Sequence, residues 1–265
     1  MTVLAETPLN VTGTRKIAFE RLVRVELRKL ADTRAGRWLL ISVAALTALV
    51  LVIQLWVVVA QDLQVDFSDF LLAMNTPMGI LLPVLGVMSV TSEWSQRTAM
   101  VTFALEPSRL RVVAAKLVSV LVVSVGALAV GLLLGALAQL LYGVLSGNEL
   151  VWGSAGTLAF NYLVSWVLGM VTGFAYGALL LNSAAGIVVY FVYSFVLPIP
   201  FAIGAQLMDW FDHLRPWIDF SFAQGPLLQG SLTGSEWAHL ATSGLIWLVL
   251  PLVVGIWRIN RAEVK

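Results

Sequence analysis

The stretch WLLISVAALTALVLVIQLWVVVA, from Trp38 to Ala60, decides the class of fold. It contains no charged residue, and a helix needs about 20 apolar residues to cross the hydrocarbon core of a bilayer. The whole chain agrees: 59% of its residues are hydrophobic and 12% are charged, whereas soluble domains carry about 25% charged residues. A long polar lead without a cleavage site precedes the stretch, so we expect it to stay in the membrane. The chain is predicted to be an all-α integral membrane protein.

Further apolar runs predict five more spans. Pro83 is expected to kink the second, Asn182 and Ser183 divide the longest run into a helical hairpin, and Pro198 and Pro200 should break the fifth span near the outer surface. Residues 205–235 then form short, partly re-entrant outer helices. The spans are predicted at about 38–60, 76–92, 117–141, two within 155–205, and 236–257, which gives a six-span domain over 38–257 between an N-terminal segment, 1–37, and a tail, 258–265.

Basic residues gather in the segments on one side of these spans. Short loops that are rich in Lys and Arg stay in the cytoplasm, and the opposite loops carry mainly acids. Both termini and the loop 93–116 are therefore predicted to be cytoplasmic. The basic residues on that side are Arg15, Lys16, Arg21, Arg24, Arg28, Lys29, Arg34, Arg37, Arg97, Arg109, Arg111, Lys116, Arg258, Arg261 and Lys265.

An amphipathic helix is predicted just before the first span. One face is apolar, although Glu26 interrupts it, and the other face is basic. Such a helix lies on the membrane surface, where it either anchors the N-terminus to anionic lipid or moves the first span; both readings stay open. The apolar face holds Phe19, Val23, Leu27 and Leu30, and the basic face holds Arg21, Arg24 and Arg28.

Small residues recur at every fourth position of the fourth span. Ser165, Gly169, Gly173 and Gly177 form a ladder that lets another helix approach closely. Ladders of this kind are more often packing surfaces than substrate linings, so we expect helix packing here.

The predicted span cores carry no Asp, Glu, Lys or Arg, which argues against an ion-coupled transporter. Gln54, Gln139 and Asn161 are the polar residues left inside, and we expect them to form interhelical hydrogen bonds rather than to bind substrate. The chain has no Cys, two His, a net charge of +1 and no HExxH, GxSxG or GxxxxGK[ST] motif. We therefore expect no enzyme activity, cofactor, metal site or nucleic-acid partner, and any pumping must draw its energy from a partner.

The loop 93–116 is the largest internal cytoplasmic segment. Thr98 to Leu105 can form a short helix, Pro107 ends it, and Ser108 can cap the next helix. One reading is a docking helix that presents charges to the cytosol; the other is a solvated loop whose charges only set topology. The charges expected to face the cytosol are Glu93, Arg97, Glu106 and Arg109.

A resemblance favours docking. The order EW at Glu93-Trp94, Thr98, a hydrophobic run, PSR at 107–109 and AK at Ala115-Lys116 resembles the loop after the second span in permeases of exporter-type ATP-binding-cassette systems, the ABC type 2 permease family. Such loops often read EW, Gly-Thr, P-x-R and AK, and here Arg97 stands where Gly commonly precedes the Thr. The six-span plan, the basic amphipathic helix and the basic tail resemble that family over the whole chain.

The resemblance implies the permease subunit of an ATP-driven exporter in the bacterial inner membrane. The chain would pair with itself or a sister permease and dock two ATPase subunits, which hold ATP and Mg, while a hydrophobic or amphipathic drug, peptide or lipid would suit the apolar interior. The alternatives are an ion-gradient-driven secondary transporter, a membrane enzyme or a non-transporting scaffold. The implied docking residues are Glu93, Arg97, Thr98, Glu106, Pro107, Ser108, Arg109 and Arg111.

Overall fold

A computed structural model describes residues 17–153 and 155–263. The described residues form helices and connecting turns with no strand among them, and six of the helical segments are long and apolar enough to cross a membrane. The all-α membrane class is confirmed, and the chain is a multi-pass membrane protein. Arg15, Lys16 and Lys265, which were counted in the basic segments, lie outside the described residues.

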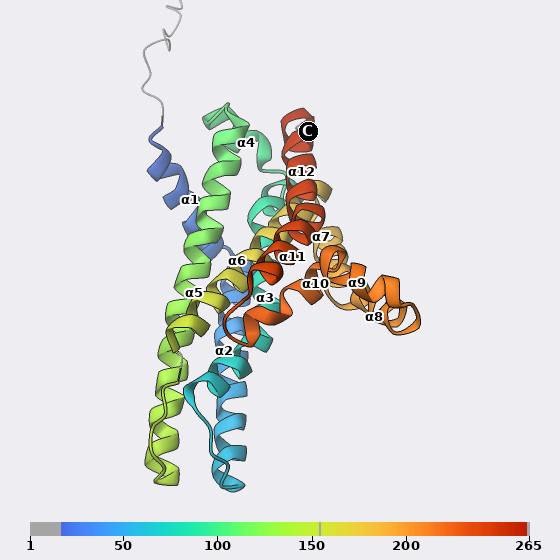
Figure 1. The fold of residues 1–265 in the computed structure, drawn as a ribbon. Helices are drawn as coiled ribbons and strands as arrows, with labels where there is room; N and C mark the ends of the chain where they lie inside the picture. The colour runs from blue at the N-terminus through green and yellow to red at the C-terminus, as the bar shows by residue number, and fades with distance from the viewer. Residues whose placement is uncertain (1–16, 154, 264–265) are drawn as a thin grey trace, which may run out of the picture.

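The first half of the chain contains three spanning helices and two short ones (Figure 1). All three spans are longer than predicted, the second and third by the most. The second begins at Phe67, because Asp66 accepts hydrogen bonds from the Ser68 and Asp69 N–H groups while the Asp69 carboxylate accepts from the Asp66 N–H, which forms a capping box. Neither of its two internal prolines ends it. The elements are α1 (Phe19–Asp32), α2 (Arg34–Ala60), α3 (Phe67–Ser95), α4 (Ala99–Leu105) and α5 (Arg109–Ser146).

The second half begins with the predicted hairpin. Leu181 has a left-handed φ of 54°, and the Asn182 side chain caps the following helix by accepting from the Ala185 N–H at 3.0 Å. The break that was predicted at Asn182 and Ser183 is confirmed. The elements are α6 (Ala155–Leu180), α7 (Ser183–Phe191), α8 (Pro198–Leu207), α9 (Asp209–Ile218), α10 (Phe220–Ala223), a 3-10 turn (Gly225–Leu228), α11 (Gly234–Gly244) and α12 (Leu250–Arg261).

The predicted break at Pro198 and Pro200 is wrong, because the fifth span runs on to Leu207. A π-helical turn, Val192–Val196, joins α7 to α8, and a second, Leu245–Val249, joins α11 to α12 just before Pro251. Proline has no N–H, and its ring clashes with the carbonyl four residues earlier. The wider turn avoids that clash, since Leu197 donates to the Val192 carbonyl five residues back at 2.9 Å.

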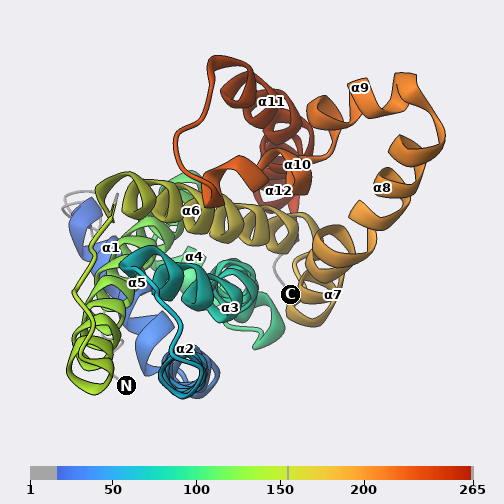
Figure 2. The same cartoon turned by 60° about the horizontal axis from the view of Figure 1, so that its bottom comes forward.

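Helices α3 and α6 form the centre of the packing. A Cβ on Gly173 would lie 2.2 Å from the Pro83 carbonyl oxygen, and Gly169 and Gly177 also face α3, so three rungs of the small-residue ladder pack within the subunit. Ser165 is half-buried. Figure 2 shows α6 between the first-half helices on one side and α10 to α12 on the other, while α8 and α9 project sideways as a hairpin. No residue of that hairpin is buried.

The three amides inside the spans bind backbone carbonyls of other segments. Gln54 donates to Asp69 and Gln139 donates to Val151, each at 3.1 Å, and Asn161 donates to Gly230. The Gln54 bond joins two helices, as predicted, whereas Val151 and Gly230 lie in loops, so Gln139 and Asn161 each tie a helix to a loop instead.

Candidate functional site

One end of the bundle carries α1, α4 and the C-terminal end of α12 (Figure 1). We call it the basic end, because the exposed side chains Arg21, Arg24 and Arg28 of α1 lie there. The three arginines lie on the exposed side of α1, as the amphipathic pattern predicted. Arg24 forms an exposed pair with Glu20 at 2.6 Å.

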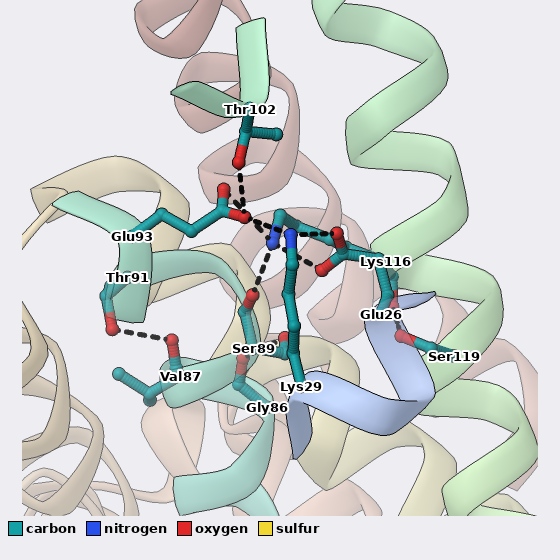
Figure 3. Close-up of polar contacts among 10 residues, drawn as sticks. All are labelled: Glu26, Lys29, Gly86, Val87, Ser89, Thr91, Glu93, Thr102, Lys116 and Ser119. Atoms are coloured by element: carbon teal, nitrogen blue, oxygen red, sulfur yellow. Dashed lines mark hydrogen bonds and ion pairs between the residues drawn. The ribbon is translucent and has the colours of Figure 1, made fainter. Parts of the chain in front are cut away.

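Four charged side chains from three helices meet beneath α4 in what we call the ion cluster: Glu26, Lys29, Glu93 and Lys116 (Figure 3). The Lys116 ammonium lies 2.6 Å from Glu26 Oε2 and 3.3 Å from Glu93 Oε2. The Lys29 ammonium lies 2.7 Å from Glu26 Oε1 and 2.5 Å from Glu93 Oε1. Each carboxylate therefore sits between two ammonium groups, and the four charges sum to zero.

Three of the four ion-cluster residues are buried, and their hydrogen bonds are well satisfied. Lys116, Glu93 and Glu26 are 3%, 5% and 6% exposed. Lys116 also donates to the Ser89 carbonyl at 3.1 Å, and Thr102 of α4 donates to Glu93 Oε1 at 2.9 Å. Buried charges are tolerated only when they are paired with good geometry, so α1, α3, α4 and α5 are held together at this point.

Burial lowers the pKa of Lys29, but the carboxylates of Glu26 and Glu93 outweigh burial and raise that pKa above its ordinary value of 10.5. Lys29 therefore stays charged throughout the physiological pH range. The half-exposed position of its side chain leaves one side of the ion cluster within reach of water.

One prediction is confirmed at the ion cluster and one is wrong. Glu26 interrupts the apolar face of α1, as predicted, because it lies on the side of the helix that packs on the bundle, next to Leu30. Glu93 was expected to face the cytosol, but α3 and α5 extend past their predicted ends, so Glu93 and Lys116 belong to spanning helices and are buried. Lys29 and Lys116 were not predicted as site residues, and the one signal for them in the sequence was the isolated carboxylate of Glu26.

The loop that joins α3 to α4 turns at Arg97, where φ is 58°. This is the left-handed region, which glycine adopts most easily. Thr98 follows at the N-cap position of α4, and its N–H donates to the Glu93 carbonyl at 2.9 Å, although its side chain makes no capping bond. Arg97 is exposed, as predicted.

Glu106 does not face solvent, contrary to the prediction, because it is 7% exposed and paired with Arg111 at 2.7 Å. Arg111 also donates to the Ile17 carbonyl at 2.6 Å, which ties the loop to the start of α1. Pro107 separates α4 from α5, as predicted, and Ser108 occupies the N-cap position of α5 without a side-chain capping bond.

Arg109 also points inward. Its Nη1 donates to the carbonyls of Ile259, Asn260 and Ala262 at 2.6, 3.2 and 2.8 Å, and its guanidinium lies 5.0 Å from the ring centre of Phe103. The last carbonyls of a helix have no partner inside the helix. Arg109 supplies one for α12, so it joins the end of the chain to the start of α5 rather than facing the cytosol.

The outward face of α4 is apolar, because the charges around it point inward. Met100, Val101 and Leu105 are 55%, 62% and 70% exposed. A cavity of about 440 Å³ separates α4 from α1, with Val25 and Leu105 among its apolar walls and the carboxylates of the ion cluster at its base. The basic end thus offers a short helix with exposed apolar residues, tied to α3 by the Thr102–Glu93 hydrogen bond and to α5 by the contact between Phe103 and Arg109.

Among the described residues, no three His, Cys, Asp or Glu side chains are grouped in a way that could hold a metal ion. His239 instead packs edge-on against Trp217, with ring centres 4.4 Å apart. In comparisons with known proteins, no family model and no curated protein matches this chain, so its function is inferred from the geometry of the basic end and from the resemblance in the loop.

Proposed function

We propose that this chain is the permease subunit of an ATP-driven exporter of the ABC type 2 permease kind. It forms a translocation path with a second copy or a sister permease, and two separate ATPase subunits that bind ATP and Mg dock on α4. The observation that carries the proposal is the exposed apolar face of α4 at the basic end.

An apolar face outside the spanning helices calls for a partner. Contiguous exposed apolar surface at such a position marks an interaction site, and Met100, Val101 and Leu105 supply it. The adjoining cavity, with Val25 and Leu105 in its walls, offers room for an apolar side chain of the partner between α4 and α1. The partner surface is therefore expected to be a groove that accepts α4, with apolar residues at its centre.

A movement of α4 and the adjoining start of α5 would be transmitted to several spanning helices. Thr102 binds Glu93 of the ion cluster, Glu106 pairs with Arg111 on α5, and Arg109 binds the end of α12. Switching between two arrangements of the spans requires different contacts in each. We expect α1, α4 and the adjoining ends of α3 and α5 to move as one unit when the ATPases close.

Two further points support the proposal. The left-handed backbone at Arg97 lies where the resembling family commonly has Gly, which is the residue that favours this conformation. The concentration of Arg and Lys at the basic end favours a cytoplasmic location for it, as docking on a soluble ATPase requires.

Association with the ATPase tests the docking face. Leu105→Asp places a charge on the exposed face of α4, and Leu145→Asp makes the same change at an exposed position near the far end of α5. We expect Leu105→Asp to lower recovery of an ATP-hydrolysing subunit with the tagged permease by about tenfold or more, and Leu145→Asp to leave it unchanged. Equal recovery with both variants contradicts docking through α4.

Orientation can be tested separately, because the chain has no Cys. A Met100→Cys variant carries a unique thiol on α4. We expect a membrane-impermeant maleimide to label it in inverted vesicles and not in intact cells. Labelling in intact cells would place α4 outside and remove the basis for ATPase docking.

The ion cluster is also compatible with one alternative function, that of an ion-coupled transporter. Buried ionisable groups within spanning helices, such as Glu93 and Lys116, also occur in ion-coupled transporters. Loss of transport on adding an uncoupler while ATP is held constant would favour that alternative over ATP-driven export.

A further inference from the structure

The cavity between α1 and α4 is a groove with one edge on each of these short helices. On the α4 edge, Val101 and Leu105 are exposed, so the groove is open between the two helices. Positions four residues apart line the α1 edge, and residues at that spacing lie on one face of a helix. The positions on the α1 edge are Ile17, Arg21, Val25, Lys29 and Thr33.

The interior of the groove suits a hydrocarbon chain. Leu22, Val101 and Val112 supply apolar walls from three helices, and the volume of about 440 Å³ lies within the range of ~300–1,000 Å³ that is usual for small-molecule sites. An acyl chain that moves here from the bilayer exchanges one apolar surrounding for another, so it gains little from the hydrophobic effect. The headgroup must therefore decide which amphiphile binds.

Two basic side chains on the α1 edge can still bind an anion. The Lys29 ammonium has three N–H groups and donates to Glu26 and Glu93, which leaves one N–H without a partner among the described residues. The Lys29 side chain is 37% exposed, so that N–H is within reach of a ligand. Within residues 17–153 and 155–263, the Arg21 side chain has no hydrogen bond or ion pair.

The carboxylates that line the groove are already paired, so they contribute no net charge. The ion cluster at its base sums to zero, and Glu106 pairs with Arg111. Arg21 is then the excess charge of the groove. An anionic headgroup matches this charge, whereas a cationic headgroup is repelled by it.

The groove lies where lipid headgroups are expected. Thr33 directly precedes the spanning helix α2, and Trp38, on the second turn of α2, is exposed and of a type that gathers at the membrane interface. Arg21 and Lys29 are eight residues apart, about 12 Å along α1, so the two long side chains can reach a phosphate held between them. The cytoplasmic leaflet, which the basic residues favour for this end, contains anionic lipids.

We propose that the groove binds an anionic phospholipid, with its phosphate between Arg21 and Lys29 and one acyl chain between α1 and α4. This lipid site needs no ATPase, so the protein is tested alone. A partner side chain that enters the groove would displace the acyl chain.

Two pairs of exposed positions give matched variants that leave the core untouched. Arg21→Gln removes the excess charge of the groove, and Arg28→Gln makes the same change on α1 at a position that does not line the groove. Val101→Trp places a large ring in the groove, and Met100→Trp places the same ring on α4 outside it.

The probe is phosphatidylglycerol with a diazirine and an alkyne on one acyl chain. It is a minor component of phosphatidylcholine nanodiscs at about 0.15 M salt, where exposed charges more than ~8 Å apart are largely screened. We expect cross-links to residues 17–33 and 98–112, mapped by mass spectrometry, that excess phosphatidylglycerol suppresses more strongly than excess phosphatidylcholine. Arg21→Gln should lower this labelling about fivefold, equivalent to ~1 kcal/mol, and Val101→Trp should lower it at least as much. The two control variants should change it less than about twofold.

Equal suppression by the two lipids reflects contact with bulk lipid only and overturns the proposal. Equal losses with Arg21→Gln and Arg28→Gln indicate diffuse attraction to the basic surface and contradict the phosphate contact. Labelling that Val101→Trp leaves unchanged places the acyl chain outside the groove. Stronger suppression by oleate than by phosphatidylglycerol identifies a free fatty acid as the ligand and contradicts the phospholipid.

Discussion

Replacing Lys116 by Met should release α1 from the bundle. The substitution keeps most of the side-chain volume and removes an ammonium that lies 2.6 Å from Glu26 and 3.3 Å from Glu93. Two buried carboxylates would then share Lys29 alone. Breaking a buried ion pair by removing one partner costs roughly 3–5 kcal/mol, and we expect a value near the lower end because Lys29 and Thr102 remain beside Glu93.

Labelling of a buried thiol measures this loss. Leu30 of α1 is 8% exposed, and the chain has no other Cys, so Leu30→Cys reports each opening of α1 to a maleimide. A loss of ~3 kcal/mol raises the population of the open form, and with it the labelling rate, about a hundredfold. The rate is measured in nanodiscs with and without Lys116→Met.

Two control variants test whether the faster labelling arises from the loss of charge balance in the ion cluster. Arg24→Met removes an exposed pair with Glu20, which should cost less than about 1 kcal/mol and change labelling only slightly. Adding Glu26→Gln to Lys116→Met removes the one excess negative charge and should recover at least ~1 kcal/mol. If Lys116→Met labels no faster than Arg24→Met, the ion cluster does not hold α1 and the proposed unit of motion fails.

Three further outcomes follow from the packing, the end of α12 and the pKa of Lys29. Gly173→Ala should destabilise the fold by about 1–3 kcal/mol in denaturant titrations, because its Cβ would lie 2.2 Å from a carbonyl oxygen, whereas Gly156→Ala, which has open space, should not. Arg109→Met should speed hydrogen exchange of residues 258–262 about tenfold or more, since charged hydrogen bonds are worth ~1.5–3 kcal/mol. The pKa of Lys29 is raised above its ordinary value of 10.5, so the stabilising contribution of Lys29 is complete below about pH 10.5 and is lost as pH rises through the higher folded-state pKa. A thermal unfolding midpoint that falls above that pH in the natural chain but not in Lys29→Met would agree. A fall between pH 7 and 9 that Lys29→Met abolishes would contradict it.

The spans were predictable because lipid demands long apolar helices, and hydropathy alone identified all six. Their ends were not, since polar residues such as Asp66 and Lys116 continue a helix once a cap or an ion pair satisfies them. The continuation of the fifth span through Pro198 was not predictable either, because a π-helical turn depends on backbone geometry rather than on composition.

The position of the candidate site along the chain was predictable, but the orientation of three of its charged side chains, Glu93, Glu106 and Arg109, was predicted wrongly. The sequence placed a short helix between Thr98 and Leu105, and the structure has it at Ala99–Leu105. The inward orientation of Glu93 depends on the ion cluster, which includes Glu26, far away in the sequence. No local pattern reveals that Glu26 pairs with Lys116. Long-range charge pairing is therefore the information that a single sequence lacked here.

The balance of the ion cluster has an electrical consequence. A membrane potential does work of about 2.3 kcal/mol per elementary charge per 100 mV on a charge that crosses the field. Glu26 and Glu93 cancel Lys29 and Lys116, so these four residues together carry no net charge through the field. The ion cluster therefore adds nothing to the voltage dependence of that step, although it places four charged groups in the moving unit.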